Sequence, residues 1–223
     1  IEVGLEKFDS YRVTEICDDM LREDSQIETA RKLYTAIIDL TPGTNPNSSN
    51  SLSNLLDSAS RLLTDQPILE KTIDYLIKTS NQSPPNRSLF QGWSTSSGGR
   101  HNNAATYLVR FLARDETDES FRKVFENRVR EELEKDEQWH EGSIWLGLYL
   151  AAMKRYDEAK ERLEPLIDDD TKPTPTHDMA WLTGSLIDEH KPMHDFAEKL
   201  YEYALENLSD NSNREFQYSL CGR

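Results

Sequence analysis

Cysteine and histidine are scarce in this chain. Its 223 residues include two cysteines, Cys17 and Cys221, and five histidines. Two thiols so far apart in the sequence form neither a disulfide framework nor a zinc site, because both need clustered residues. His190 and His194 have the spacing of two ligands on one helical face, but Pro192 between them interrupts a helix. The sequence therefore predicts no metal ion and no other cofactor.

Long apolar runs are absent as well, since none approaches the roughly 20 residues that a membrane-spanning helix requires. Basic residues are few: 26 Lys and Arg stand against 41 Asp and Glu, which gives a formal net charge of -15. Nucleic acids and anionic membranes bind basic surfaces. We therefore expect neither nucleic-acid binding nor direct membrane insertion, and the acidic balance favours a basic or amphipathic protein partner.

The start of the chain lacks the features of a signal peptide. It begins at Ile1 without Met, and no positively charged segment precedes an apolar run. We expect a mature or excised piece of a longer protein. The sequence leaves the compartment open, between the cytoplasm and an extracytoplasmic space, and it leaves the oligomeric state open as well.

Glycine and proline are also few, with nine of each, and they separate stretches of helical periodicity. This periodicity is clearest in residues 140–173, where an apolar block over 144–153 precedes a stripe made of Tyr156, Ala159, Leu163 and Leu166. Gly147 and Ala159 are small where two antiparallel helices would approach most closely, because a larger side chain would push the pair apart. Pro165 predicts that the second helix kinks or ends early.

The same arrangement recurs in residues 178–210. A second apolar block, over 179–187, precedes a stripe that repeats the earlier spacing, made of Ala197, Tyr201, Ala204 and Leu208. Residues 168–175 are expected to form a loop that accounts for the additional residues between the two patterns.

These patterns resemble the tetratricopeptide repeat, a pair of antiparallel helices with a period of about 34 residues. The matching positions are Leu146, Gly147, Tyr156, Ala159 and Leu163 in the first unit and Trp181, Ala197, Tyr201 and Ala204 in the second. The resemblance implies an all-α fold, an α-solenoid of antiparallel helical hairpins without β-sheet, formed as a single domain over residues 1–223. The alternative is an ordinary helical bundle, in which small and aromatic residues occur at the same spacing.

Three divergent units are expected at 11–43, 50–80 and 88–136. In the first, the second half resembles the family through Ala30, Tyr34, Ile37 and Pro42, whereas Asp18 stands where a small residue is expected. In the second, residues 52–63 predict an amphipathic helix, and Pro67 suits the first turn of its partner. In the third, residues 115–135 predict one long, charged helix.

Residues 91–103, rich in glycine and serine, interrupt the third unit. Gly98 and Gly99 would let the backbone approach an anion, with Arg100 and His101 as donors. However, the segment lacks the preceding strand and the following Lys-Ser/Thr of a phosphate loop. The alternative is a flexible connection with Trp93 packed on a neighbouring unit, and the role of the segment stays open.

No catalytic motif is present. The sequence contains no GxSxG, HExxH or GxGxxG pattern. The adjacent acids Asp168, Asp169 and Asp170 lie in a proline-flanked segment that is expected to face solvent, whereas acid-base catalysis needs two carboxyl groups held in unlike environments. We therefore predict that the chain is not an enzyme.

The function that the resemblance implies is non-catalytic binding of another protein. Stacked hairpins form a curved ribbon whose concave face can hold an extended peptide or a helix. In tetratricopeptide domains the first helix of each unit lines this face, and the corresponding positions here are Glu141, Leu148, Ala152, Met179, Leu182, Leu186 and Glu189. Ordinary core packing is the alternative for each. The Lys and Asn with which some family members grip a peptide carboxylate are replaced by apolar or acidic residues, so that mode is not expected.

Two other functions stay open beside the interaction scaffold. One is an α-helical enzyme acting on a polymer such as a glycan, with two carboxyl groups roughly 5 to 9.5 Å apart in a cleft lined by Trp93, Trp145 or Trp181. The other is a purely architectural or self-association domain.

Overall fold

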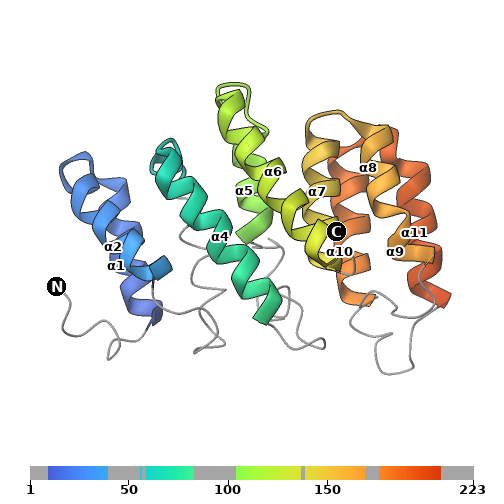
Figure 1. Ribbon diagram of the computed structural model, residues 1–223, viewed down its shortest axis with the longest axis horizontal. Coiled ribbons are helices and arrows are strands. Elements are labelled where there is room, and N and C mark those ends of the chain that lie inside the picture. The colour runs from blue at the N-terminus through green and yellow to red at the C-terminus, as the bar shows by residue number, and fades with distance from the viewer. Residues whose placement is uncertain are drawn as a thin grey trace. The chain divides into compact units, whose positions relative to one another are not determined.

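The computed structural model describes residues 10–39, 56, 59–82, 104–136, 139–168 and 176–206. Every regular element in these ranges is a helix, so the all-α class is confirmed for them (Figure 1). The chain divides into two compact units, of which unit 1 covers Ile1–Pro84 and Asn102–Arg128, and unit 2 covers Pro85–His101 and Val129–Arg223. The single repeat domain stays a prediction. Residues 91–103, Pro42 and Cys221 lie outside the described residues.

The described part of unit 1 contains α1 (Ser10–Arg22), η2 (Asp24–Gln26), α2 (Ile27–Asp39), η3 (Ala59–Arg61), α4 (Gln66–Gln82), α5 (Ala104–Leu112) and the first part of α6 (Glu119–Lys135), where η denotes a 3-10 helix. Helix α1 packs against α2, and α2 packs against α4. Pro67 lies in the first turn of α4, as predicted. Of the helix expected over residues 52–63, only Leu56 and the residues from Ala59 onward are described, and η3 forms its end.

The described part of unit 2 contains the rest of α6, then α7 (His140–Ala152), α8 (Tyr156–Leu163), α9 (Pro165–Asp168), α10 (Thr176–Glu189), η4 (Lys191–Met193) and α11 (His194–Glu206). Helix α7 packs against α8, and α10 packs against α11. Helix α10 also contacts α7. Two helical hairpins therefore lie next to each other within this unit (Figure 1).

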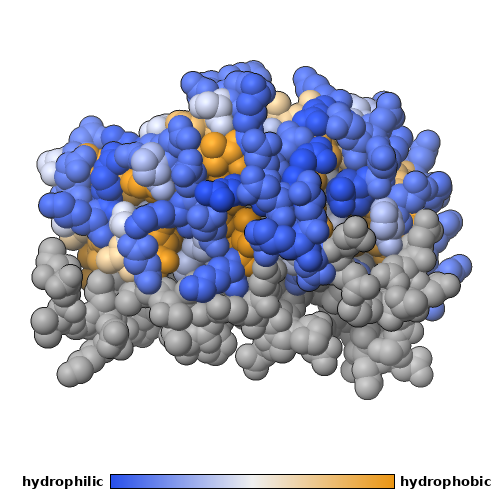
Figure 2. Space-filling model, in the orientation of Figure 1, coloured by the Kyte–Doolittle hydropathy of each residue, from blue (hydrophilic) through white to orange (hydrophobic). Residues whose placement is uncertain are grey.

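The core of unit 1 forms where α1, α2 and α4 turn their apolar stripes inward. The buried side chains include Cys17 and Leu21 of α1, Ala30, Tyr34 and Ile38 of α2, and Ile68, Leu69, Ile73, Leu76 and Ile77 of α4. The face in Figure 2 is mostly hydrophilic, and apolar side chains show between α2 and α4. The helical periodicity of the sequence therefore identifies this core correctly.

Cys17 and Asp18, in the second half of α1, both form hydrogen bonds within unit 1. Burial, and secondarily the charge of Asp18, raises the pKa of the Cys17 thiol to about 12. This thiol lies 3.6 Å from the carbonyl oxygen of Ala30, to which it donates, and it is therefore an ordinary buried thiol. Asp18 is half-buried, and its Oδ2 accepts a hydrogen bond of 2.8 Å from Arg22 one turn later. The acid thus occupies a position where the sequence pattern favours a small residue.

Ion pairs connect η2 and α2 to the segment that follows them. Asp24 pairs with Arg61, Arg31 with Asp65, and Asp39 with Lys71. All three pairs are partly or largely exposed, so each contributes little free energy. The three pairs connect the two segments at their surface.

Two buried hydroxyl groups, which are hydrogen-bonded to each other, connect α2 to α4 inside the core. The oxygens of Tyr34 and Thr72 are 2.9 Å apart, and both side chains are fully buried. The Thr72 hydroxyl donates its one hydrogen to the carbonyl of Ile68, at 2.8 Å, so the Tyr34 hydroxyl must be the donor to Thr72. Burial raises the pKa of Tyr34, which keeps this donor protonated.

This direction of donation predicts unequal effects of two substitutions. Thr72→Val leaves the buried Tyr34 hydroxyl without an acceptor, and we expect it to lower the free energy of unfolding by about 1–3 kcal/mol. Tyr34→Phe removes a donor whose acceptor already has another bond, and we expect a loss of only about 0.5–1.5 kcal/mol. Urea unfolding followed by circular dichroism measures both. A larger loss for Tyr34→Phe would contradict the assigned direction.

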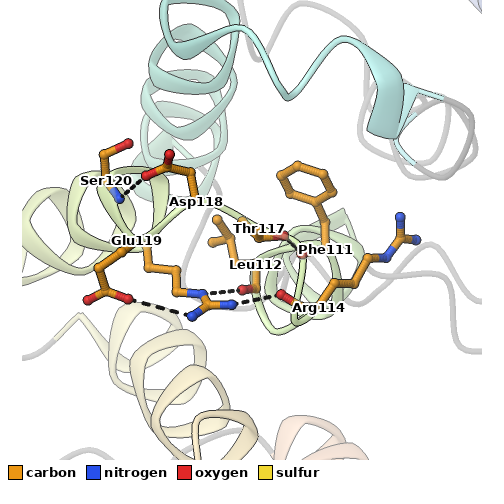
Figure 3. Close-up of polar contacts among 8 residues, drawn as sticks. Phe111, Leu112, Arg114, Thr117, Asp118, Glu119 and Ser120 are labelled. Carbon is orange, nitrogen blue, oxygen red and sulfur yellow. Dashed lines mark hydrogen bonds and ion pairs between the residues drawn. The ribbon is translucent and has the colours of Figure 1, made fainter.

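The corner between α5 and α6 explains why α6 begins later than the sequence predicts. Asp118 caps the helix, because its Oδ1 accepts a hydrogen bond of 2.7 Å from the backbone N–H of Ser120 (Figure 3). This bond lowers the pKa of Asp118. The predicted start at residue 115 is therefore corrected to Glu119, because Asp118 caps the helix and ends the preceding turn.

A side chain of α6 also closes the end of α5. The Arg122 guanidinium donates to the carbonyl oxygens of Leu112, at 2.9 Å, and of Arg114, at 2.7 Å, while the Thr117 hydroxyl donates to Phe111 at 2.7 Å (Figure 3). Carbonyl groups at a helix C-terminus have no partner within the helix, and a cation there is favourable. Arg122 thus joins the two helices at this corner.

The hairpin of α7 and α8 depends on a close contact. A Cβ atom at Gly147 would lie 2.5 Å from Cγ of Leu163, and Ala159 is fully buried. Both small residues therefore lie where the helices approach most closely, as predicted. Helix α8 ends at Leu163, and α9 starts at Pro165, so the early end of the second helix is confirmed.

The turn between these helices uses a residue in the left-handed region. Lys154 has φ of 60°. The N–H of Lys154 donates to Ala151 and that of Arg155 to Leu150, at 2.9 and 2.8 Å, which is the Schellman pattern of helix ends. A non-glycine residue pays about 1–2 kcal/mol for this conformation. Only three residues separate α7 from α8, so the turn fixes them as an antiparallel pair.

Candidate functional site

The candidate binding positions lie on α7 and α10, which contact each other in unit 2. The ring of Tyr156, at the start of α8, lies 6.4 Å from that of His190, just after α10. The C-terminal ends of α7 and α10 therefore lie at the same end of the unit. Ala152 is the last residue of α7, and Glu189 is the last residue of α10. Glu141 lies in the first turn of α7, about 16 Å from Ala152 along the helix axis.

Three of the apolar candidates belong to the core. Leu182 and Leu186 have no exposed surface, and Leu148 is 6% exposed. Their burial matches core packing, the alternative for these positions, and a partner would reach them only by displacing a helix. Met179 lies in α10, but its side chain is outside the described part. Ala152 is half-buried and Glu189 is exposed, so these two remain accessible together.

The burial of α7 extends all around the helix. Ten consecutive residues, from Gly142 to Ala151, are buried. A helix that is apolar on every side is typical of a core position. The sequence carried this signal, because residues 144–150 form an apolar block without a polar face.

Trp139 and Gly142 form a contact that the sequence analysis missed. A Cβ atom at Gly142 would overlap the Trp139 ring, so the missing side chain lets the indole lie on the first turn of α7. The Trp139 and Trp145 ring centroids are 5.2 Å apart with planes at 79°, an edge-to-face arrangement. Trp145 is only 2% exposed, so it lines no solvent-open cleft of the kind that a glycan enzyme would need.

The two histidines with helical spacing take separate roles. The His194 Nε2 lies 2.9 Å from the carbonyl oxygen of Ile187 and donates to it, which satisfies a group at the end of α10. His190 is half-buried, and burial lowers its pKa, with the charge of Glu189 acting in the opposite sense. Within the described ranges, no three His, Cys, Asp or Glu side chains group so as to hold a metal ion.

Glu141 is the candidate with the most unusual electrostatics. Burial raises the pKa of its carboxyl group, a hydrogen bond from its own backbone N–H opposes this shift, and the charge of Asp136 adds to it. The ionised form is therefore less stable in the folded chain than in the unfolded chain. Glu158, on α8, shows the opposite behaviour, because hydrogen bonds of 2.6 and 2.7 Å from Arg155 lower its pKa.

No protein-family model, curated protein or solved structure matches the chain. The resemblance to tetratricopeptide repeats therefore stays a prediction from the residue pattern. Across the described residues, no helix combines the length and the apolar character needed to cross a membrane.

The pKa shifts of Glu141 and Glu158 predict opposite effects of replacing each residue with glutamine. At pH 7 the ionised Glu141 destabilises the folded chain, so we expect Glu141→Gln to raise the thermal midpoint. The difference from wild type should vanish as the pH falls through the raised pKa toward 4.5 and below. Glu158→Gln removes a favourable ionised group, so we expect a small decrease at pH 7 that disappears as the pH falls below 4.5. Thermal unfolding between pH 7 and pH 3 measures both. A lower midpoint for Glu141→Gln at pH 7 would contradict the cause assigned to its shift.

Proposed function

We propose that this chain is a non-catalytic module that binds another protein through the exposed faces of stacked, tetratricopeptide-like helical hairpins. The observation that carries this proposal is the sequence separation of the contacts between neighbouring elements. Within unit 1, Arg31 pairs with Asp65, 34 residues away, and the ion pair of Asp24 and Arg61 spans 37. Within unit 2, Tyr156 and His190 are in ring contact at the same offset of about 34 residues, which is the family period.

This recurrence supports hairpins arranged in layers, since equivalent positions of successive layers then meet. The hairpin of α7 and α8 contacts that of α10 and α11 at two places, through α10 with α7 and through η4 with α8. A layered arrangement leaves helix faces open to solvent along its length, and such faces bind extended peptides or helices. The net charge of -15 favours a basic or amphipathic segment as the partner.

Among the candidate side chains that the structure describes, Glu189 is exposed, and it lies with the half-buried Ala152 at one end of unit 2, whereas the half-buried Glu141 lies at the start of α7. We place the contact with the partner around Glu189. Leu182 is unsuitable for testing it, because a charge at a fully buried position would unfold the hairpin instead of altering a surface. Glu189 is exposed and can be changed without this effect.

The proposal is tested by affinity capture on the immobilised chain, followed by direct binding of each purified protein that is retained. We expect the retained partner to bind Glu189→Lys at least about tenfold more weakly than wild type, a loss of about 1.4 kcal/mol. The matched control is Glu198→Lys, which makes the same charge reversal at an exposed position of α11 and should leave binding unchanged.

Two outcomes would contradict the proposal. Equal loss with both variants would indicate general charge attraction. Light scattering that finds only self-association, with no retained partner, would favour the architectural alternative.

A further inference from the structure

Helix α1 has an apolar surface wider than its packing partners cover. Cys17 and Leu21, one turn apart, are buried beside α2. Ile16 and Met20 form a second stripe, also one turn apart and rotated by about 100° from the first. Ile16 is 50% exposed and Met20 is half-buried, so much of this second stripe faces solvent.

Acidic side chains flank this stripe on its outer side. Glu15 and Asp19 are exposed and lie one turn apart. At about 100° per residue they follow Ile16 and Met20 around the helix, on the side away from the core. The surface of α1 therefore passes from buried apolar, through exposed apolar, to acidic.

The other large exposed apolar side chain among the described residues does not belong to an exposed apolar stripe. Ile187 of α10 is 44% exposed. One turn before it, Thr183 is fully buried, and one turn after it, Lys191 lies beyond the end of the helix. Ile187 is therefore an isolated exposed residue, which is ordinary in proteins, whereas Ile16 belongs to a stripe.

We propose that the stripe of Ile16 and Met20 docks an amphipathic helix with a basic flank, supplied by another protein. A narrow apolar ridge with residues four apart is complementary to the apolar face of a second helix, and Lys or Arg on the flank of that helix would face Glu15 and Asp19. A second copy of this chain is a poorer occupant, because its net charge of -15 repels its own kind. Residues of unit 1 form this surface, whereas residues of unit 2 form the one around Glu189.

The probe is a fluorescent synthetic peptide that forms an amphipathic helix with a leucine face and a lysine flank, and its binding is measured by anisotropy. A peptide with glutamate in place of lysine serves as its control and should not bind. We expect Ile16→Lys to weaken binding of the lysine peptide about tenfold or more. The matched variant Ile187→Lys adds the same charge at the isolated position and should leave the affinity within about twofold.

A second pair of variants separates docking from general attraction between opposite charges. Glu15→Gln with Asp19→Asn should weaken binding several-fold and reduce its salt dependence. Glu198→Gln with Glu202→Gln, which removes two exposed acids one turn apart on α11, should have little effect. Circular dichroism checks that all variants are folded.

Three results would overturn this inference: equal losses with both acid pairs, equal losses with both isoleucine variants, or binding of the glutamate peptide as tight as that of the lysine peptide. A dimer in sedimentation that Ile16→Lys dissociates would show that a second copy occupies the stripe. Failure of these tests leaves the proposed function intact if a partner still depends on Glu189.

Discussion

The approach of Gly147 to Leu163 sets the distance between α7 and α8, and α10 of the second hairpin packs on the same α7. With no side chain at 147, the Leu163 side chain packs directly on the backbone of α7. This spacing allows Ala159 and Leu163 to be completely buried. The second hairpin then packs on α7 through α10, so the helix that carries Gly147 joins the two described hairpins of unit 2.

Unit 1 holds its helices together with different chemistry. Hydroxyl groups of Tyr34 and Thr72 connect α2 to α4 inside the core, and exposed or partly exposed ion pairs connect α2 to α4 and to the residue before it. In both units most of the apolar stripes predicted from the sequence are buried in contacts between helices. The binding that we propose therefore involves positions at helix ends and outer faces, such as Glu189 and Ile16, and not the middle of α7 or α10.

The sequence predicted the elements well, because helical periodicity and proline positions are local properties. Gly147, Pro67 and Pro165 each take the role expected from their type. The candidate surface was less predictable, since periodicity shows which residues are apolar but not what covers them. Leu182 and Leu186 therefore fit the pattern of a binding face, although the structure buries both completely. Lys154 gave no signal either, because lysine has no preference for the left-handed conformation that it adopts.

The most direct test of the central contact is the effect of Gly147→Ala on stability in two backgrounds. Glycine to alanine inside a helix ordinarily stabilises by about 0.8–1 kcal/mol, but here the new methyl group would meet Leu163 at 2.5 Å. We predict that Gly147→Ala lowers the urea midpoint of the wild-type chain and raises it, or leaves it unchanged, when Leu163→Ala has made room. A higher midpoint for Gly147→Ala in the wild-type background would contradict the close approach on which the account of unit 2 rests.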